Sequence, residues 1–144
     1  MKTDVSIIYV NYYTSGLLVD SIQSVVNKTI GITYEIIIID NNSEKNLRQK
    51  LQESISDTIP VKYLFLQENI GFGKANNEGA KIASGKYLLF LNPDTILLNN
   101  AIKILYDFME SDPQAGACGG NLYDSSNNPL FSFRKIFPGF IWDF

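Results

Sequence analysis

Carboxylate and amide side chains follow four hydrophobic segments of the chain, each at the point where the segment ends. In chain order they are Asn11 with Tyr12, Asp40 to Ser43 (DNNS), Glu68 to Gly71 (ENIG), and Asn92 to Thr95 (NPDT). Any one of these groups is an ordinary turn or helix-capping sequence. Four of them in succession predict instead that polar groups gather at one edge of the fold.

Asp94 raises the sharpest chemical question, because it follows the hydrophobic run YLLFL directly. A carboxylate there must be solvated, paired or bound to a cation, since an unpaired buried charge costs too much. A nucleoside diphosphate at the same edge would carry more negative charge than Lys74 and a few amides offset. A divalent cation, completed by phosphate oxygens and water, would balance that charge. Asp94 is the candidate ligand, and its alternative roles are a turn cap or a partner for a lysine.

A glycine-containing loop, NIGFGKANNEG over residues 69–79, is a second candidate for holding phosphate. Gly71 and Gly73 precede a predicted helix, where free amides and the helix dipole favour an anion. Lys74 would add a positive charge. The alternative is that the two glycines only shape the loop and the start of the helix.

The composition excludes several function classes. The chain has 144 residues, 45% hydrophobic and 19% charged, which predicts one compact domain over residues 1–144. A net charge of −3 and a pI near 4.8 disfavour nucleic acid as a partner. The sequence has no histidine, so chemistry that needs an imidazole base or ligand is excluded and carboxylates must do acid–base work. The single cysteine, Cys118, permits no intramolecular disulfide and favours a reducing, cytoplasmic setting.

Membrane spanning is not expected, because the apolar runs EIIIID and YLLFL are far too short and no signal-like segment opens the chain. The aromatic stretch FRKIFPGFIWDF, residues 133–144, includes Arg134 and Lys135. Packing on its own domain is the favoured role for this stretch. Peripheral contact with the inner face of the plasma membrane is the alternative.

Hydrophobic periodicity predicts alternating strands and helices. We expect strands over 4–10, 34–40, 61–67, 86–91 and 115–124, and a turn at 125–129. Helices are expected from Ser15 to about Asn27, near 47–55 with Leu47, Leu51 and Ile55 on one face, ahead of Gly85, and after an Asn99 cap with Ile102, Leu105, Phe108 and Met109 inward. This order predicts an α/β fold, a mostly parallel sheet with helices on both faces. Ligands of such sheets bind beyond the carboxyl ends of the strands.

A dinucleotide-binding dehydrogenase is the first alternative, because Asp40 follows the first strand at about the interval of a ribose-binding acid. The loop after that strand is NYYTSG and lacks the G-x-G-x-x-G pattern that cradles a pyrophosphate. This departure weighs against NAD or FAD. The sequence contains no P-loop pattern either.

Four blocks of the sequence resemble the nucleotide-sugar glycosyltransferases of the Rossmann-like GT-A fold, in the inverting family 2. They are VSIIYVNYYTSGLLVDSIQSV, YEIIIIDNNSEKN, ENIGFGKANNEGAKIASGKYLLFLNPDT and AGACGGNLYD, in the family's order, and the likeness extends to about Arg134. The N-P-D-T variant most resembles the bacterial rhamnosyltransferase-like subgroup, which builds surface polysaccharides.

The resemblance implies a role for each matching position. Asn11 and Tyr12 would contact the base or ribose of the donor, and Asp40 the edge of the base or ribose. The same pocket would be lined by Asn42, Asn69, Gly71 and Lys74. Asp94 matches the last acid of the family's D-x-D motif and would ligate Mn²⁺ or Mg²⁺ through the diphosphate. Asn92 stands where the first Asp of that motif usually lies, which removes one negative charge.

The family's reaction implies that a carboxylate deprotonates an acceptor hydroxyl, on a saccharide or a lipid-linked sugar, which displaces the nucleoside diphosphate with inversion. The acids downstream of Asp94 are Asp107, Glu110, Asp112, Asp124 and Asp143. None lies in a motif that identifies it as the base, so the catalytic residue is not assigned. We therefore expect this chain to be a fragment: the donor-binding, N-terminal part of a longer glycosyltransferase. The alternative is a noncatalytic nucleotide-binding or interaction module that uses the same edge of the sheet.

Overall fold

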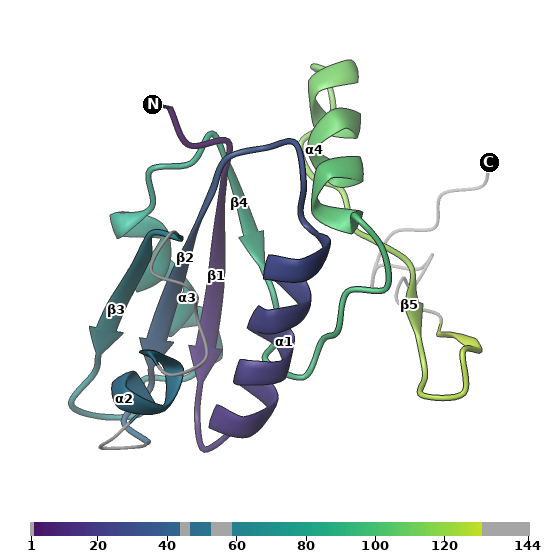
Figure 1. Cartoon of the computed structure of the whole chain (residues 1–144). Helices are drawn as coiled ribbons and strands as arrows, with labels where there is room; N and C mark the ends of the chain where they lie inside the picture. Colours follow the sequence, from purple (N-terminus) through teal and green to yellow (C-terminus); the bar gives the residue numbers. More distant parts are fainter. Residues whose placement is uncertain (1, 44–46, 53–58, 131–144) are drawn as a thin grey trace, which may run out of the picture.

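A four-stranded parallel sheet forms the centre of the protein. The computed structural model describes residues 2–43, 47–52 and 59–130. The strands are β1 (Val5–Asn11), β2 (Tyr34–Asp40), β3 (Val61–Phe65) and β4 (Tyr87–Phe90), in the spatial order β3-β2-β1-β4 (Figure 1). All three neighbouring pairs run parallel. The predicted parallel sheet is therefore confirmed.

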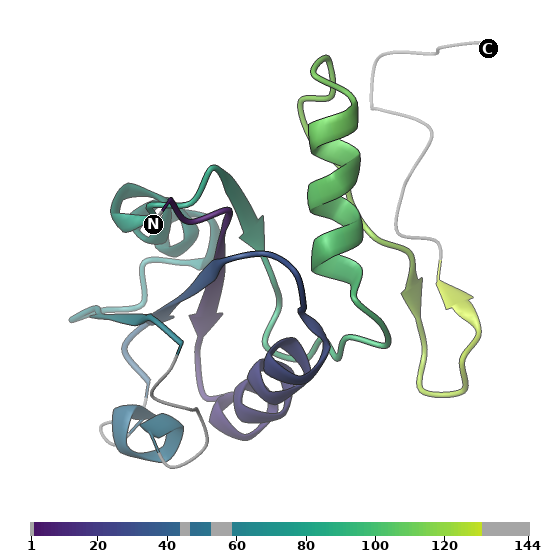
Figure 2. The same ribbon diagram turned by 45° about the horizontal axis from the view of Figure 1, so that its top comes forward.

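Helices cover both faces of this sheet, as predicted. They are α1 (Ser15–Lys28), α2 (Leu47–Gln52), α3 (Phe72–Ile82) and α4 (Ala101–Ser111). Helices α1 and α2 lie on one face and α3 on the other (Figures 1 and 2). The first helix begins at the predicted Ser15. The predicted Ile55 of the second helix lies outside the described residues.

The two central strands, β1 and β2, are apolar on both sides, so helices must cover both faces of the sheet. All seven residues of β1 are buried, and six of the seven in β2. Their side chains alternate between two cores, because successive residues of a strand point to opposite faces. Ile7 and Tyr9 pack in the core that includes Leu18 and Ile22 of α1. Ile8 joins the smaller core beneath α3.

Two glycines set how closely the elements after β3 approach the sheet. A Cβ on Gly79 of α3 would lie 2.7 Å from a methyl carbon of Ile8 and of Ile39, so this helix rests directly on β1 and β2. A Cβ on Gly85, between α3 and β4, would lie 2.4 Å from the backbone nitrogen of Ser6. Only glycine fits that turn without moving β1.

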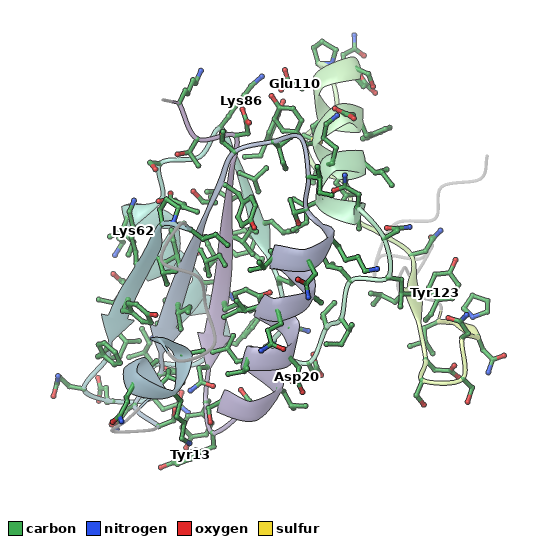
Figure 3. The ribbon with its side chains drawn as sticks, in the orientation of Figure 1. Tyr13, Asp20, Lys62, Lys86, Glu110 and Tyr123 are labelled. Atoms are coloured by element: carbon green, nitrogen blue, oxygen red, sulfur yellow. The ribbon has the colours of Figure 1, made fainter. Side chains whose placement is uncertain are left out.

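A polar cluster ties the strands together at their amino ends. We call it the amino-end cluster: Ser6, Glu35, Lys62, Ser84. The Glu35 carboxylate, 3% exposed, accepts hydrogen bonds from Ser6 Oγ at 2.6 Å and from Ser84 N at 2.7 Å. Lys62 Nζ lies 2.8 Å from its second oxygen. Figure 3 shows Lys62 toward this end and Tyr13 at the opposite end of the sheet.

The prediction of a fifth strand over 115–124 is wrong. Only Leu122–Tyr123 forms a strand, β5, and it pairs antiparallel with β6 (Pro129–Leu130) in a separate two-stranded sheet. This hairpin lies on the side of α4 away from the main sheet (Figures 1 and 2). Gly116, Gly119 and Gly120 make an extended conformation costly in the preceding residues. The predicted turn at 125–129 is confirmed, with Asp124 accepting backbone hydrogen bonds from Ser126 and Asn128.

Helix α4 is less buried than its apolar pattern predicts. Its N-cap residue is Asn100 rather than Asn99, and Ile102 is buried. Leu105 and Met109 are half-buried, whereas Phe108 is 47% exposed, which contradicts the expected inward position. Figure 1 shows the reason, since α4 stands beside β4 and extends past the start of the strands instead of lying flat on the sheet.

Strand β4 lies at one edge of the described sheet and leaves apolar surface uncovered. Leu88 and Phe90 are 42% and 49% exposed. Among the helices in the described ranges, none is both long and apolar enough to cross a bilayer. The stretch 133–144, for which we weighed packing against membrane contact, lies outside the described residues.

Candidate functional site

A cleft lies at the carboxyl ends of the strands, where the sequence predicts the ligand. Its volume is about 410 Å³. Its lining comes from the end of β1, the loops after all four strands, α1 and the start of α3: Val10, Tyr12, Thr14, Leu17, Asn41, Asn69, Gly71, Phe72, Asn92, Pro93 and Asp94. The structure thus brings together five predicted site residues, namely Tyr12, Asn69, Gly71, Asn92 and Asp94.

Asn11 and Asp40 are not part of the lining of this cleft. They end β1 and β2 side by side in the parallel register. Asn11 is fully buried, and its Nδ2 donates to Asp40 Oδ1 at 3.0 Å and to Ser43 Oγ at 2.9 Å. Its Oδ1 accepts from Thr14 Oγ1 at 3.0 Å. The Asn11 amide is therefore used within the protein, where it holds the loops that form the cleft.

Asp40 is a buried carboxylate with polar partners on both oxygens. It is 5% exposed, and it accepts hydrogen bonds from Asn11 Nδ2, from Ser43 Oγ and from Ser43 N. Such partners are required, because an unsatisfied charge at this depth would destabilise the fold. Direct contact between Asp40 and a base or ribose stays a prediction.

Asn42 and Lys74 are exposed and do not line the cleft. Asn42 has a positive φ of 60°, a left-handed conformation that asparagine tolerates better than most residues. It therefore shapes the turn after β2. Lys74 lies in the first turn of α3, beside the cleft residues Gly71 and Phe72. The predicted pocket roles of both residues stay predictions.

Asn41 is a cleft residue that the sequence analysis counted among the polar groups at the strand ends but to which it gave no role in the pocket. It is 2% exposed and connects the end of β2 to the loop ahead of α3. Its Nδ2 donates to Asn69 Oδ1 at 2.7 Å, and its Oδ1 accepts from Ile70 N at 3.0 Å. Strand alternation offered a signal, since it places Asn41 on the opposite face from Asp40, on the side that α3 covers.

The turn that carries Asp94 is anchored to α1. Thr95 N donates to Asn92 O at 3.1 Å within the turn. Ser21 Oγ of α1 donates to Thr95 O, and Ser24 Oγ accepts from Leu97 N at 3.0 Å. These hydrogen bonds fix the backbone just after Asp94. The turn that carries Asp94 is therefore anchored to α1.

A buried tyrosine supports the same anchor. Tyr9 OH lies 3.0 Å from Ser21 Oγ, and it must be the donor because the single hydroxyl proton of Ser21 is directed at Thr95 O. Burial raises the pKa of Tyr9. The phenol therefore stays protonated at neutral pH and keeps donating to Ser21.

The Asp94 carboxylate is exposed and neither hydrogen-bonds nor pairs with any described residue. The alternatives of a side-chain cap and a lysine pair therefore do not hold within the described part of the chain. Among the described residues that line the cleft there is no lysine or arginine, and Asp94 is the single carboxylate. No group of three acidic or cysteine side chains in the described ranges is placed to hold a metal unaided. A cation here would need ligand oxygens in addition to Asp94, which fits a hard divalent ion bound through phosphates.

The downstream acids with described positions do not line the cleft. Glu110 pairs with Lys86 near the amino ends of the strands, as Figure 3 shows, and Asp107 pairs with Lys103 on α4. Asp124 holds the β5–β6 turn. Asp143 lies outside the described residues. None of the described acids is placed to act as the base at this cleft.

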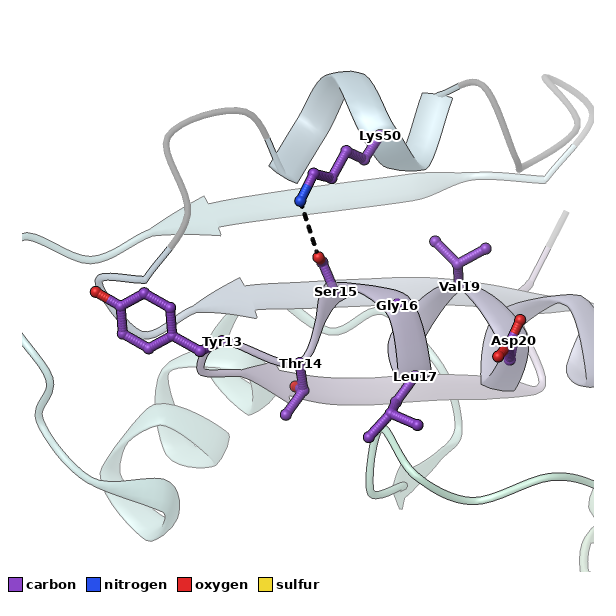
Figure 4. A pocket seen from close by; sticks show the side chains of 8 residues that line it. All are labelled: Tyr13, Thr14, Ser15, Gly16, Leu17, Val19, Asp20 and Lys50. Atoms are coloured by element: carbon purple, nitrogen blue, oxygen red, sulfur yellow. Dashed lines mark hydrogen bonds between the residues drawn. The ribbon is translucent and has the colours of Figure 1, made fainter.

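A second, larger hollow of about 710 Å³ adjoins the cleft along the start of α1 (Figure 4). Its lining residues are Tyr13, Thr14, Ser15, Gly16, Leu17, Val19, Asp20 and Lys50. Lys50 Nζ donates to Ser15 Oγ at 3.2 Å. Thr14 and Leu17 line both hollows. The smaller cleft remains the candidate site, because the predicted residues of the strand ends converge there.

Solved structures of glycosyltransferases share this fold. The structure is similar to Staphylococcus aureus TarS 1-349 in complex with UDP-GlcNAc, with a TM-score of 0.67 and 21% identity, over 76% of this chain and 32% of the TarS chain. It is also similar to the mannosyltransferase PcManGT from Pyrobaculum calidifontis in complex with GDP-Man and Mn²⁺. That likeness has a TM-score of 0.71 and 15% identity, over 81% of this chain and 34% of the other.

Sequence relatives agree with this fold. The poly-beta-1,6-N-acetyl-D-glucosamine synthase of Staphylococcus aureus is 32% identical over 105 residues. That match covers 71% of this chain, which thus spans about a quarter, 25%, of the synthase's length. The family model described as "Glycosyl transferase family 2" matches residues 6–142, nearly the whole sequence. The chain therefore belongs to glycosyl transferase family 2.

Proposed function

We propose that the cleft binds the nucleoside diphosphate of a sugar donor and that the chain is the donor-binding part of a glycosyltransferase. The observation that carries this proposal is Asp94, an exposed carboxylate at the carboxyl ends of a parallel sheet that pairs with no described residue. Hydrogen bonds to α1 anchor the turn that carries it. Family membership and the donor complexes of structural neighbours support it. The aromatic rings of Tyr12 and Phe72 line the same cleft and offer apolar surface to a base or sugar.

The charge of the cleft explains how such a donor would be held. A diphosphate would meet Asp94 and no lysine or arginine among the described lining residues. Direct contact between two anions is unfavourable, so we infer that Mn²⁺ or Mg²⁺ bridges them, with Asp94 as its protein ligand. A bound divalent ion would stabilise the charge that develops on the leaving diphosphate. The Mn²⁺ in the structure of the mannosyltransferase supports this inference.

The proposed reaction is transfer of the sugar to an acceptor hydroxyl with inversion, in the synthesis of a bacterial surface polysaccharide. A carboxylate base would take the hydroxyl proton while the oxygen forms a bond to the anomeric carbon and the nucleoside diphosphate leaves. The described residues of this chain supply donor binding. Assignment to the rhamnosyltransferase-like subgroup remains a proposal from the N-P-D-T sequence.

Calorimetry with UDP, GDP and dTDP, each with and without Mn²⁺, tests donor binding. We expect at least one nucleotide to bind, and to bind more tightly with Mn²⁺. The substitution Asp94→Asn should remove the gain from Mn²⁺. It should not weaken binding without metal, because it removes a negative charge that faces the diphosphate. Asp107→Asn is the matched control, because it makes the same charge change at an exposed ion pair on α4. The proposal is wrong for this chain if none of the three nucleotides binds.

A noncatalytic nucleotide-binding module is the second candidate function. The observation that favours it is that no described acid downstream of Asp94 lines the cleft. The two functions differ in turnover. Release of UDP from a UDP-sugar that depends on an added saccharide acceptor would support the enzyme, whereas tight donor binding with no release by the full gene product would support the module.

A further inference from the structure

Two asparagine side chains in the cleft have orientations that the backbone dictates. Asn41 Oδ1 faces Ile70 N at 3.0 Å, and Asn69 Oδ1 faces Gly71 N at 2.9 Å. A backbone N–H can only donate, so the atom opposite it in each side chain must be the amide oxygen. Asn41 Nδ2 then points at Asn69 Oδ1, 2.7 Å away. The three bonds are mutually consistent, and reversing either amide would break them.

As a consequence, the Asn69 side chain can offer a ligand only its Nδ2, a hydrogen-bond donor. Its Oδ1 already accepts from both Asn41 Nδ2 and Gly71 N. Asn69 is exposed and lines the cleft, so its Nδ2 remains to face a ligand. That nitrogen is a donor and cannot accept. The Gly71 N–H is also committed to Asn69, so it is not available to a phosphate in this arrangement.

Asn41 is well placed to hold this arrangement. It is 2% exposed, and its backbone N donates to Asn11 O at 2.9 Å, which fixes it to the end of β1. Its side chain contacts two consecutive residues of the loop that leads into α3. The Asn41 amide is buried and both of its ends are paired, so it fixes the orientation of Asn69. The Asn69 amide therefore loses little further entropy when a ligand binds.

We propose that Asn41 is a positioning residue that turns the Asn69 amide so that its Nδ2 donates a hydrogen bond to an oxygen acceptor of the nucleotide donor. This inference rests on the proposed function, since it specifies how the same cleft selects its ligand. The acceptor is an oxygen of the nucleoside, such as a base carbonyl, or an oxygen of the diphosphate. Because Nδ2 can only donate a hydrogen bond, a ligand that places an N–H opposite Nδ2 is disfavoured.

The first test is Asn69→Asp, which keeps an oxygen for Asn41 and Gly71 and replaces the Nδ2 donor with a second oxygen. We expect the Kd of the best-binding nucleotide to rise about three- to tenfold, the usual effect of losing one hydrogen bond. Asn77→Asp is the matched control, because Asn77 is an exposed residue of α3 outside the cleft lining. Its Kd should stay within twofold of the original chain.

Parallel titrations with the nucleoside diphosphate and the free nucleoside distinguish the two sources of the oxygen. Equal weakening of both ligands by Asn69→Asp places the acceptor on the nucleoside. Weakening of the diphosphate alone, in Asn69→Asp and also in the uncharged variant Asn69→Ala, places it on a phosphate. Unchanged affinity for both would overturn the proposal.

The second test is Asn41→Asp, which preserves shape but places an oxygen opposite Asn69 Oδ1. The repulsion should reverse the Asn69 amide, so that it presents its oxygen to the cleft. In nitrogen-15 correlation spectra of the full chain, nucleotide should shift the Asn69 side-chain NH₂ signals of the original protein. In Asn41→Asp those signals should no longer shift, and the Kd should rise by a similar factor. A merely structural role for Asn41 would lower the unfolding temperature and leave the ligand-induced shift intact.

The outcomes separate this inference from the proposed function. If the original chain binds no nucleotide, the proposed function fails and the inference with it. If it binds nucleotide with Mn²⁺ but both Asn41→Asp and Asn69→Asp bind equally well, the proposed function stands and the positioning role of Asn41 is wrong.

Discussion

Replacing Glu35 by glutamine should destabilise the fold strongly at neutral pH and weakly in acid. In the amino-end cluster, one Glu35 oxygen accepts from Ser6 Oγ, Ser84 N and Ser84 Oγ, and the other faces Lys62 Nζ at 2.8 Å. A glutamine can keep its oxygen toward the first three donors. Its NH₂ group would then face the ammonium of Lys62, so a donor would oppose a donor.

The pKa of Glu35 sets the size of this effect. Burial raises the pKa of the carboxyl, but hydrogen bonds from Lys62, Ser6 and Ser84 outweigh burial and lower it from 4.5 to about 2. A depression of that size corresponds to about 3 kcal/mol of stability at neutral pH. Lys62 is 40% exposed, so solvent screening reduces the expected contribution to about 2 kcal/mol.

The sign of the pH dependence follows from the lowered pKa. Because the carboxyl binds its proton more weakly in the folded protein than in the unfolded chain, the stabilisation is complete above about pH 4.5 and is lost as the pH falls toward 2. The difference in unfolding free energy between the original protein and Glu35→Gln should therefore be about 2 kcal/mol at neutral pH. It should fall to less than half of that near pH 3.

Urea unfolding followed by circular dichroism from neutral pH to about pH 3 measures this difference. Asp107→Asn is the control, since it neutralises an exposed carboxylate in an i,i+4 pair with Lys103 and should have a much smaller effect. Nucleotide affinity should be unchanged in Glu35→Gln, because the cluster lies at the other end of the sheet from the cleft. A stability difference that does not vary with pH would refute the assigned role of the ionised carboxylate.

Three further substitutions test other parts of the structure. Gly85→Ala should destabilise the fold by about 1–3 kcal/mol in urea unfolding, because its Cβ would lie 2.4 Å from a backbone nitrogen of β1. Ser21→Ala should cost about 1–3 kcal/mol in the same assay, since Thr95 O and the hydroxyl of Tyr9 lose their partner. An unchanged unfolding midpoint would contradict either expectation. Phe72→Ala should raise the nucleotide Kd several-fold in calorimetry without lowering the unfolding midpoint, because this cleft residue is 55% exposed.

The central part of the fold was predictable because its residues obey one strong pattern. The runs SIIYV and EIIIID are apolar on both faces, which only a strand covered on both sides satisfies, and the structure buries them. The segment 115–124 lacks such an apolar run and carries three glycines. It forms only β5, whose partner is the nearby β6. Leu122 found a local partner in Leu130 rather than the edge of the main sheet.

The location of the candidate site could be predicted from the sequence, but not all of the residues that line it. Strand ends locate the cleft, so Asn69, Asn92 and Asp94 meet there as expected. Strand alternation places Asn41 and Asn42 on opposite faces of the sheet, but only the structure shows that Asn41 rather than Asn42 lines the cleft. Asn11 has the expected position but is buried, because its amide completes hydrogen bonds between two loops.

The amino-end cluster and the cleft lie at opposite ends of the same strands. This separation determines which substitutions the fold can tolerate. Glu35 and Asp40 belong to one strand, five residues apart, or about 16 Å at the usual rise per residue. Substitutions in the loops around the cleft therefore leave the hydrogen bonds and the ion pair of the amino-end cluster intact. Under the proposed function, loops of other family 2 proteins could therefore be grafted onto this sheet to change which sugar nucleotide it accepts, because the contacts of the amino-end cluster do not involve those loops.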